Sequence, residues 1–245
     1  MKKLFAALLA LCLMIPAFAA VADTLTMGTN AFFPPYEYYE GETIVGIDAD
    51  IAALIAEKLG MDLDIQNMEF DAIIPAVTSG KVLIGMAGMT VTPERLQNVN
   101  FSDTYAIGIQ AIIVPENSEI KTVDDLYAEG AAYLVGVQQG TTGDIYCTDD
   151  FGEDRVRRYK NGPDAVLALS NGSVDCVIID NEPAKNFVAA TEGLVILESK
   201  YAEEEYAICM SLENTELLDK INKALEELEA EGKLEEIVEK YIKPE

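Results

Sequence analysis

One arginine stands where a basic side chain can bind an anion. Arg95 lies in the segment GMTVTPER, which follows a predicted strand and opens a predicted helix. Thr92 is positioned to cap that helix, with Pro93 in its first turn. A guanidinium can hold a carboxylate with two parallel hydrogen bonds, so Arg95 is a candidate for carboxylate binding. An exposed helical arginine paired with a surface acid is equally compatible with the local sequence.

Two other segments carry polar groups directly after apolar strands. Residues 136–144, GVQQGTTGD, are typical of a strand, a glycine turn and a helix start, whose free N–H groups can bind an anion. An ordinary strand-to-helix turn is the simpler interpretation, since the Gly-Lys-Ser/Thr ending of a phosphate-binding loop is missing. Asp180 ends the strand DCVIID and either caps the next helix or binds a cation, capping being the simpler local interpretation.

An aromatic cluster, FFPPYEYY, occupies residues 32–39 after the first predicted strand. Its two prolines stiffen the loop because each fixes one backbone torsion. The rings either pack in the core or lie over a ligand, and the local sequence does not decide between these two roles.

The composition excludes several kinds of chemistry. The chain has 245 residues, 43 of them acidic against 17 Lys and Arg, and no histidine. Without histidine there is no Ser-His-Asp or Cys-His catalytic system and no His-ligated zinc or haem. The net charge of −26 disfavours nucleic acid and anionic membranes as partners. We therefore expect no metal and no cofactor.

The elements that must position these residues alternate along the chain. Short apolar strands are followed by amphipathic helices, a pattern typical of an α/β fold. One helix is expected to begin with Asp48 as its cap and to end at Gly60. Two stretches, AVTSGKVLIGMAGMT and LALSNGSVDCVIIDN, share a helix–strand order that suits two similar lobes. Ligands of such sheets bind beyond the carboxyl ends of strands, which indicates Thr90 and Asp180.

The N-terminus is typical of a secretory signal peptide. Residues 1–22, MKKLFAALLALCLMIPAFAAVA, combine two lysines, a short apolar stretch and Ala-x-Ala patterns. Cleavage is predicted after Ala22, with Ala19 as the alternative. Cys12 follows a leucine, whereas a lipidated cysteine follows a small residue. We therefore expect an exported protein in the periplasm rather than a cell-surface lipoprotein.

Taken in order, these motifs resemble those of family 3 bacterial extracellular solute-binding proteins, the polar amino-acid receptors of ABC importers. The resemblance covers nearly everything from Leu25 to Pro244, and it rests on the order and spacing of its segments. They are FFPPYEYYEGETIVGIDADIAALIAEKLG, FDAIIPAVTSGKV, GMTVTPERLQNVNFSDTY, GVQQGTTGD and VDCVIIDNEPA.

The resemblance implies a type II periplasmic-binding-protein fold, with two Rossmann-like lobes joined by a two-strand hinge. Lobe 1 would be discontinuous, comprising residues 23–105 and 206–245, and lobe 2 would comprise residues 110–201. The hinge strands would cross at about 105–109 and 202–206. Ligand binding would hold the closed state by motion about this hinge.

The resemblance also implies how the backbone of an amino-acid ligand is held. Arg95 would clamp the α-carboxylate, with Gly88 and Thr90 adding a backbone and a hydroxyl contact. Thr142 would help from the other lobe at the start of its helix. Asp180 would take the α-ammonium. A zwitterion needs one cationic and one anionic clamp, and opposite lobes supply them.

The remaining predicted contacts concern the ligand side chain. Phe33 and Phe70 would sandwich it, and Asn30 and Gln138 would touch its distal end. Met89, in the same loop as Gly88 and Thr90, completes the predicted site.

The predicted ligand is a free L-amino acid with a polar uncharged side chain, a basic one being second. Relatives that bind basic side chains often carry an acid where Asn30 stands, and Gln138 is neutral as well. Permease subunits of the importer are the expected protein partners of a monomer. Cyclohexadienyl dehydratases are similar in fold and offer an enzyme alternative, but the presence of both Arg95 and Asp180 favours a receptor.

Overall fold

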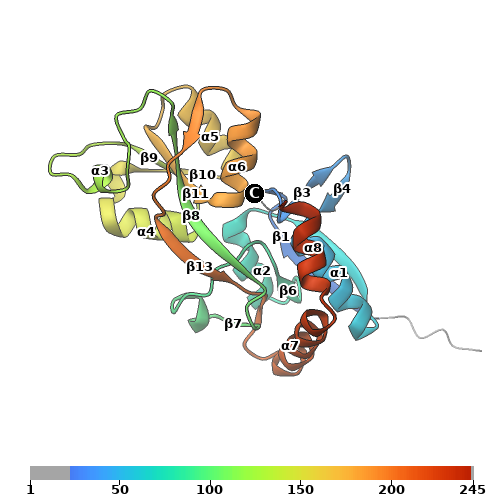
Figure 1. The fold of residues 1–245 in the computed structure, drawn as a ribbon. Coiled ribbons are helices and arrows are strands. Elements are labelled where there is room, and N and C mark those ends of the chain that lie inside the picture. Colours follow the sequence, from blue (N-terminus) through green and yellow to red (C-terminus); the bar gives the residue numbers. More distant parts are fainter. Residues whose placement is uncertain (1–22, 244–245) are drawn as a thin grey trace, which may run out of the picture.

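The computed structural model describes residues 23–243, so the predicted signal peptide lies outside the described residues. Two lobes, each built around a β-sheet with helices packed on it, make up the molecule (Figure 1). The predicted α/β class is therefore confirmed. Within residues 23–243, no helix has the length and apolar character needed to cross a membrane.

Lobe 1 contains a five-stranded sheet with the order β5-β1-β6-β14-β7. Parallel β5, β1 and β6 form one half, and β14 runs antiparallel to β6 and β7. A small sheet of β2, β3 and β4 follows β1. The strands are β1 (Thr24–Thr29), β2 (Phe32–Phe33), β3 (Glu37–Glu40), β4 (Thr43–Val45), β5 (Asp62–Asn67), β6 (Ile84–Gly85), β7 (Val99–Phe101) and β14 (Cys209–Ser211). The helices are α1 (Ile47–Leu59), η1 (Phe70–Ala72), α2 (Ile73–Thr78), η2 (Arg95–Gln97), α7 (Thr215–Ala230) and α8 (Lys233–Tyr241).

Lobe 2 contains a six-stranded sheet in which β10-β9-β11-β8-β12 are neighbours and β13 also pairs with β8. Its strands are β8 (Ala106–Pro115), β9 (Val135–Gln138), β10 (Val156–Tyr159), β11 (Cys176–Asp180), β12 (Leu194–Ile196) and β13 (Ala202–Tyr206). Its helices are α3 (Asp124–Tyr127), α4 (Thr142–Phe151), η3 (Glu153–Arg155), α5 (Gly162–Ser170) and α6 (Asn181–Ala190).

Two strands run between the lobes. The first residues of β8 pair antiparallel with the whole of β13, from Ala106 opposite Tyr206 to Gln110 opposite Ala202. Figure 1 shows this pair as the long green and orange strands that leave lobe 2 and descend toward lobe 1. The chain thus passes from lobe 1 to lobe 2 and back through neighbouring strands.

Local sequence predicts the end of α1 correctly but not its start. Gly60 ends α1 in the left-handed conformation (φ 68°), which glycine adopts without steric cost, and its N–H reaches the carbonyl of Ala56. The predicted cap Asp48 is wrong, because Gly46 occupies the cap position and Asp48 lies inside the first turn. The Asp48 carboxylate instead accepts the N–H of Gly88, 40 residues away.

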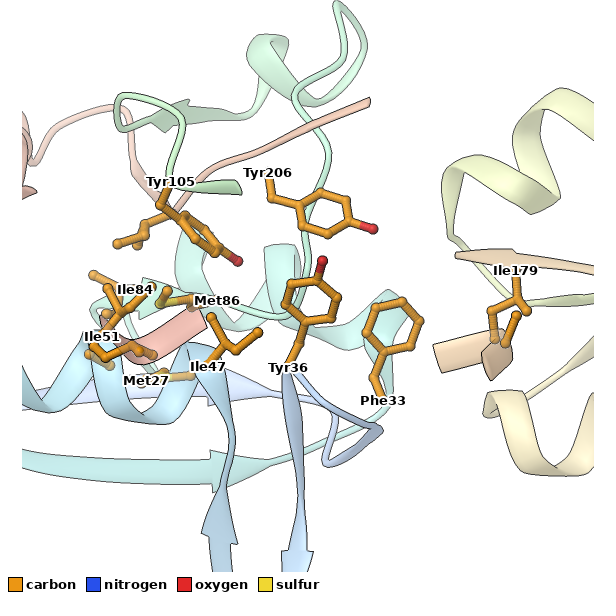
Figure 2. Packing of buried hydrophobic residues seen from close by; sticks show 14 of the residues in the cluster. Met27, Phe33, Tyr36, Ile47, Ile51, Ile84, Met86, Tyr105, Ile179 and Tyr206 are labelled. Atoms are coloured by element: carbon orange, nitrogen blue, oxygen red, sulfur yellow. The ribbon is translucent and has the colours of Figure 1, made fainter. Parts of the chain in front are cut away.

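Apolar side chains fill the space under the sheet of lobe 1 and continue toward the junction of the lobes. Met27, Ile51 and Ile84 are fully buried there. Figure 2 shows Tyr36 directed at Tyr206, whose ring centroid is 5.3 Å away in an edge-on arrangement. Aromatic packing therefore connects the loop after β1 to the second crossing strand, and it brings loop residues of lobe 1 close to lobe 2.

Candidate functional site

The predicted site residues meet at one small cavity between the lobes, with a free volume of about 10 Å³. Nine of the ten predicted residues line it, together with three that the sequence did not single out. The predicted ones are Asn30, Phe33, Phe70, Gly88, Thr90, Arg95, Gln138, Thr142 and Asp180, and the others are Glu37, Ala87 and Thr141. This free space is about that of one water molecule, so an amino-acid ligand fits only if the walls of the cavity move apart.

Met89 is the predicted residue that the structure places elsewhere. Its side chain is fully buried in an apolar cluster with Ile73 and Val77 of α2, and it is not part of the cavity lining. The Met89 side chain therefore packs in the core, whereas its neighbours Gly88 and Thr90 line the cavity. Met89 supports the loop through packing rather than through a contact in the cavity.

Arg95 is buried against both lobes. Its side chain is 7% exposed, its Nη1 donates to the Thr90 carbonyl at 2.7 Å, and its Nη2 donates to the Gly140 carbonyl at 3.1 Å. Its guanidinium carbon lies 5.4 Å from the ring centre of Phe70. Burial lowers the pKa of Arg95, but a guanidinium stays charged at neutral pH. An exposed arginine paired with a surface acid is thus excluded, and further N–H donors remain for an anion.

The carboxylate of Asp180 faces the hinge strands and does not cap α6. It makes no capping hydrogen bond, although Asp180 occupies the cap position. Instead it accepts Gln110 Nε2 at 2.9 Å and the hydroxyl of Tyr206. Tyr206 can lie this close to β8 because Gly108 has no side chain, and a Cβ there would lie 2.3 Å from the Tyr206 ring. The structure therefore favours cation binding over capping.

Burial also affects the pKa of the Asp180 carboxyl. Desolvation raises the pKa of its carboxyl well above the usual range, and the nearby carboxylate of Glu204 raises it further, while the Gln110 hydrogen bond opposes both. A cationic ligand group would stabilise the ionised form.

Side chains from both lobes contact one another across the cavity. Gln138 Nε2 donates to Asn30 Oδ1 at 2.9 Å, and the hydroxyls of Thr90 and Thr142 are 3.4 Å apart. Asn30 Nδ2 also donates to the carbonyl of Met68 at 2.7 Å. The two amides predicted to touch the distal end of the ligand are therefore largely occupied by each other and by backbone.

Three buried acids near the cavity were missed by the sequence analysis. Glu37 is 1% exposed, Asp48 0% and Glu204 4%, and each touches or lines the cavity. Among 43 acidic residues nothing in composition marks them. One signal was present for Glu204, since it stands two residues before Tyr206 in a strand and must share its buried face.

Glu37 and Asp48 form an acidic pair beside Gly88. Asp48 Oδ2 accepts the Gly88 N–H and the Tyr105 hydroxyl, both at 2.9 Å, whereas Asp48 Oδ1 and both oxygens of Glu37 meet no donor within residues 23–243. Burial raises the pKa of Asp48 to about 6 and that of Glu37 well above its usual range. Two facing buried carboxyls do not ionise together easily, so one shared proton accounts for this arrangement.

Stability should therefore depend on pH through this pair. A carboxyl whose pKa is raised by folding stabilises the fold below its unfolded value, 3.8 for Asp48, and this contribution is lost as pH rises through about 6. For Asp48 alone the change is about 3 kcal/mol. Glu37→Gln offers Asp48 a donor in place of a second acid, so we expect this variant to lose less stability between about pH 4 and pH 7.

Urea unfolding at several pH values measures this effect. Glu203→Gln, which changes an exposed acid, is the matched control and should keep the pH profile of the unmodified protein. Identical profiles for Glu37→Gln and for the unmodified protein would show that the pair does not share a proton.

Comparisons with known proteins agree with this geometry. The chain matches the model of "Bacterial extracellular solute-binding proteins, family 3" over residues 25–244. It is 34% identical to the arginine-binding extracellular protein ArtP of Bacillus subtilis over 224 residues, covering 89% of this chain and 86% of ArtP.

Solved structures of similar proteins share the fold. An ancestral arginine-binding protein bound to glutamine is 38% identical with a TM-score of 0.85, over 92% of this chain and all of that chain. The arginine-, lysine-, histidine-binding protein ArtJ of Geobacillus stearothermophilus is 31% identical with a TM-score of 0.84, over 91% and 96% of the two chains. The predicted type II periplasmic-binding-protein fold is thus confirmed.

These relatives are binding proteins and not enzymes. The comparisons therefore support a receptor without enzymatic activity over the dehydratase alternative. The match extends over nearly the whole described chain and includes the segments that build the cavity. The chain belongs to the bacterial extracellular solute-binding proteins, family 3.

Proposed function

We propose that this protein captures a basic L-amino acid, with arginine as the first candidate, and delivers it to the permease of an ABC importer. The observation that carries the choice of ligand is the buried charge. Arg95 is the one cationic side chain among the described residues that line the cavity, whereas Glu37 and Asp180 line it and Asp48 and Glu204 contact its lining. A ligand with an additional positive charge relieves this excess of acid.

The backbone of the ligand would be held by groups of opposite charge. The α-carboxylate fits the remaining donors of Arg95 and the N-terminus of α4, where Thr142 begins the helix. The α-ammonium fits the carboxylate of Asp180. Phe33 and Phe70, buried to 7% and 8% exposure, offer ring faces for the side chain, and aromatic faces attract a guanidinium or ammonium.

The prediction of an uncharged side chain loses its support for a structural reason. It rested on neutral Asn30 and Gln138, which bond to each other and to the backbone. Glu37 supplies acid to the same cavity from the start of β3. The relatives described above bind arginine, or arginine, lysine and histidine, which supports a basic ligand, while the glutamine-bound ancestral protein shows that a similar fold accepts a neutral one.

The same proposal includes the motion and the location. Residues 23–105 with 206–245 and residues 110–201 would close as two lobes about the crossing strands 105–109 and 202–206. The permease would recognise the closed form of a monomer. Membership of an extracellular family and the predicted signal peptide support export, and we propose the periplasm as the destination.

Titration calorimetry with L-arginine and L-citrulline tests the ligand class. Citrulline has nearly the shape of arginine but a neutral urea group, so their ratio of affinities isolates the side-chain charge. We expect arginine to bind at least about tenfold more tightly, since a charge-assisted hydrogen bond contributes about 1.5–3 kcal/mol. Equal or tighter binding of citrulline would contradict a basic ligand, and binding of neither would contradict this proposal for the site.

A further inference from the structure

Glu204 is a buried acid on the second crossing strand. In β13 its neighbours Glu203 and Glu205 are exposed, while Glu204 and Tyr206 point inward with exposed fractions of 4% and 0%. Burying a carboxylate is costly unless its oxygens are hydrogen-bonded. Its partners therefore indicate its role.

The Glu204 carboxylate contacts groups on either side of the hinge. Its Oε2 accepts Thr90 Oγ1 at 3.0 Å, from the loop of lobe 1, and Gln110 Nε2 at 3.1 Å, from β8. Gln110 Nε2 also donates to Asp180 Oδ2 at 2.9 Å. One amide nitrogen has two hydrogens, so Gln110 holds both acids and fixes the distance between them.

The contact with Glu204 decides what the Thr90 hydroxyl can do. A hydroxyl has a single proton, and Thr90 uses its proton on the carboxylate. The hydroxyl of Thr142, 3.4 Å away, must then be the donor toward Thr90. One lone pair of Thr90 Oγ1 is then left for the cavity, where it suits an ammonium and not a carboxylate.

We propose that Glu204 is a positioning residue for α-ammonium recognition, which orients the Thr90 hydroxyl and the Gln110–Asp180 pair so that both present acceptors to the ligand. This inference rests on the proposed function only in requiring an α-amino acid as ligand. It specifies the predicted role of Thr90, whose hydroxyl was expected to contact the ligand, as a contact with the α-ammonium. It also gives the hinge strand a direct part in ligand recognition.

The experiment compares L-arginine with its desamino analogue, which lacks only the α-amino group. Glu204→Leu removes the carboxylate that accepts these hydrogen bonds and puts an apolar side chain of similar size in its place. We expect this variant to lose about tenfold or more in affinity for arginine and less than about threefold for the analogue, so that discrimination between them collapses. Glu204→Gln retains one acceptor oxygen and should recover part of the discrimination.

Controls separate positioning from a general structural effect. Glu203→Leu, on the exposed side of the same strand, should leave both affinities unchanged. Thr90→Val keeps the shape of the side chain, so it should lose the same discrimination, and the Thr90→Val Glu204→Leu double variant should be no worse than either single variant. If Glu204→Leu folds poorly, Thr90→Val alone still tests whether the hydroxyl that Glu204 orients contributes to the discrimination.

The outcomes distinguish this inference from the proposed function. If the unmodified protein binds neither arginine nor the analogue, the proposed ligand is wrong. If it discriminates between them and Glu204→Leu keeps the same ratio of affinities, Glu204 does not position the ammonium site. Equal losses for both compounds would likewise overturn the inference, because they would indicate only structural support.

Discussion

Replacing Arg95 by alanine is expected to abolish amino-acid binding, with a loss of affinity of roughly a thousandfold. A carboxylate held by two charge-assisted hydrogen bonds gains about 1.5–3 kcal/mol from each, and each 1.4 kcal/mol corresponds to a factor of ten. Arg95 is also the cationic side chain among the described residues that line the cavity, which Glu37 and Asp180 line as well. Its loss would therefore leave these buried acids without a counter-charge. Titration calorimetry with L-arginine measures the effect.

Arg155 provides a matched control for this variant. It too lies over a phenylalanine, with its guanidinium 4.7 Å from the Phe151 ring centre, and it donates to the carbonyls of Tyr133 and Leu126. Arg155→Ala should lower stability and leave ligand affinity unchanged. A loss below tenfold for Arg95→Ala, or equal losses in the two variants, would contradict the carboxylate clamp. Arg95→Lys should be intermediate, because an ammonium cannot form the two parallel bonds of a guanidinium.

Asp180→Asn should weaken binding by a hundredfold or more, roughly the value of a charged hydrogen bond in a buried site. The change keeps the size and one acceptor oxygen but removes the charge that the α-ammonium needs. Asp175→Asn is the control, since Asp175 directly precedes the same strand, β11, is exposed, and accepts the N–H of Leu134 at 2.7 Å. Equal affinities of Asp180→Asn and the unmodified protein would exclude Asp180 as the ammonium clamp.

The pH dependence of binding provides a second measurement for Asp180. Burial and Glu204 raise the pKa of its carboxyl, whereas the ammonium of the ligand stays charged through the acid range. Protons therefore compete with the ligand, and affinity should fall as pH is lowered, beginning at a higher pH than for an ordinary aspartate. Below that pKa the loss approaches tenfold per pH unit. In Asp180→Asn this fall should be much smaller.

Several residues that line the cavity could be predicted from sequence because their surroundings are local. Arg95 follows a strand, and Thr92 Oγ1 accepts the Arg95 N–H at 3.2 Å, although the predicted helix is only the short η2, whose cap position is held by Glu94 and not by Thr92. Thr142 follows a strand and a glycine turn, and Thr141 caps its helix by accepting the N–H of Asp144. Such patterns depend on interactions among residues only a few positions apart, so a short window contains the information.

The ligand preference could not be predicted in the same way. Glu37, Asp48 and Glu204 lie in three separate segments, and contacts made 40 to 114 residues away along the chain bring the last two to the cavity. In sequence Glu37 and Asp48 cannot be told apart from exposed acids on the same elements, and only the alternation with Tyr206 distinguishes Glu204 from Glu203. The hydrogen bond that Asn30 accepts from Gln138 could not be foreseen for the same reason, because the two residues are 108 positions apart.

By itself the sequence determined the α/β class, the family, the ends of helices such as α1 at Gly60, and the placement of Arg95 and Asp180 at one cavity. Each depends on residue type, short spacing or the order of motifs. The tertiary structure alone decided that Asp180 does not cap its helix, that Met89 is core, and that Glu204 contacts Thr90. Burial and hydrogen-bond partners arise from packing between distant segments, and they determine which of many acids act on the ligand.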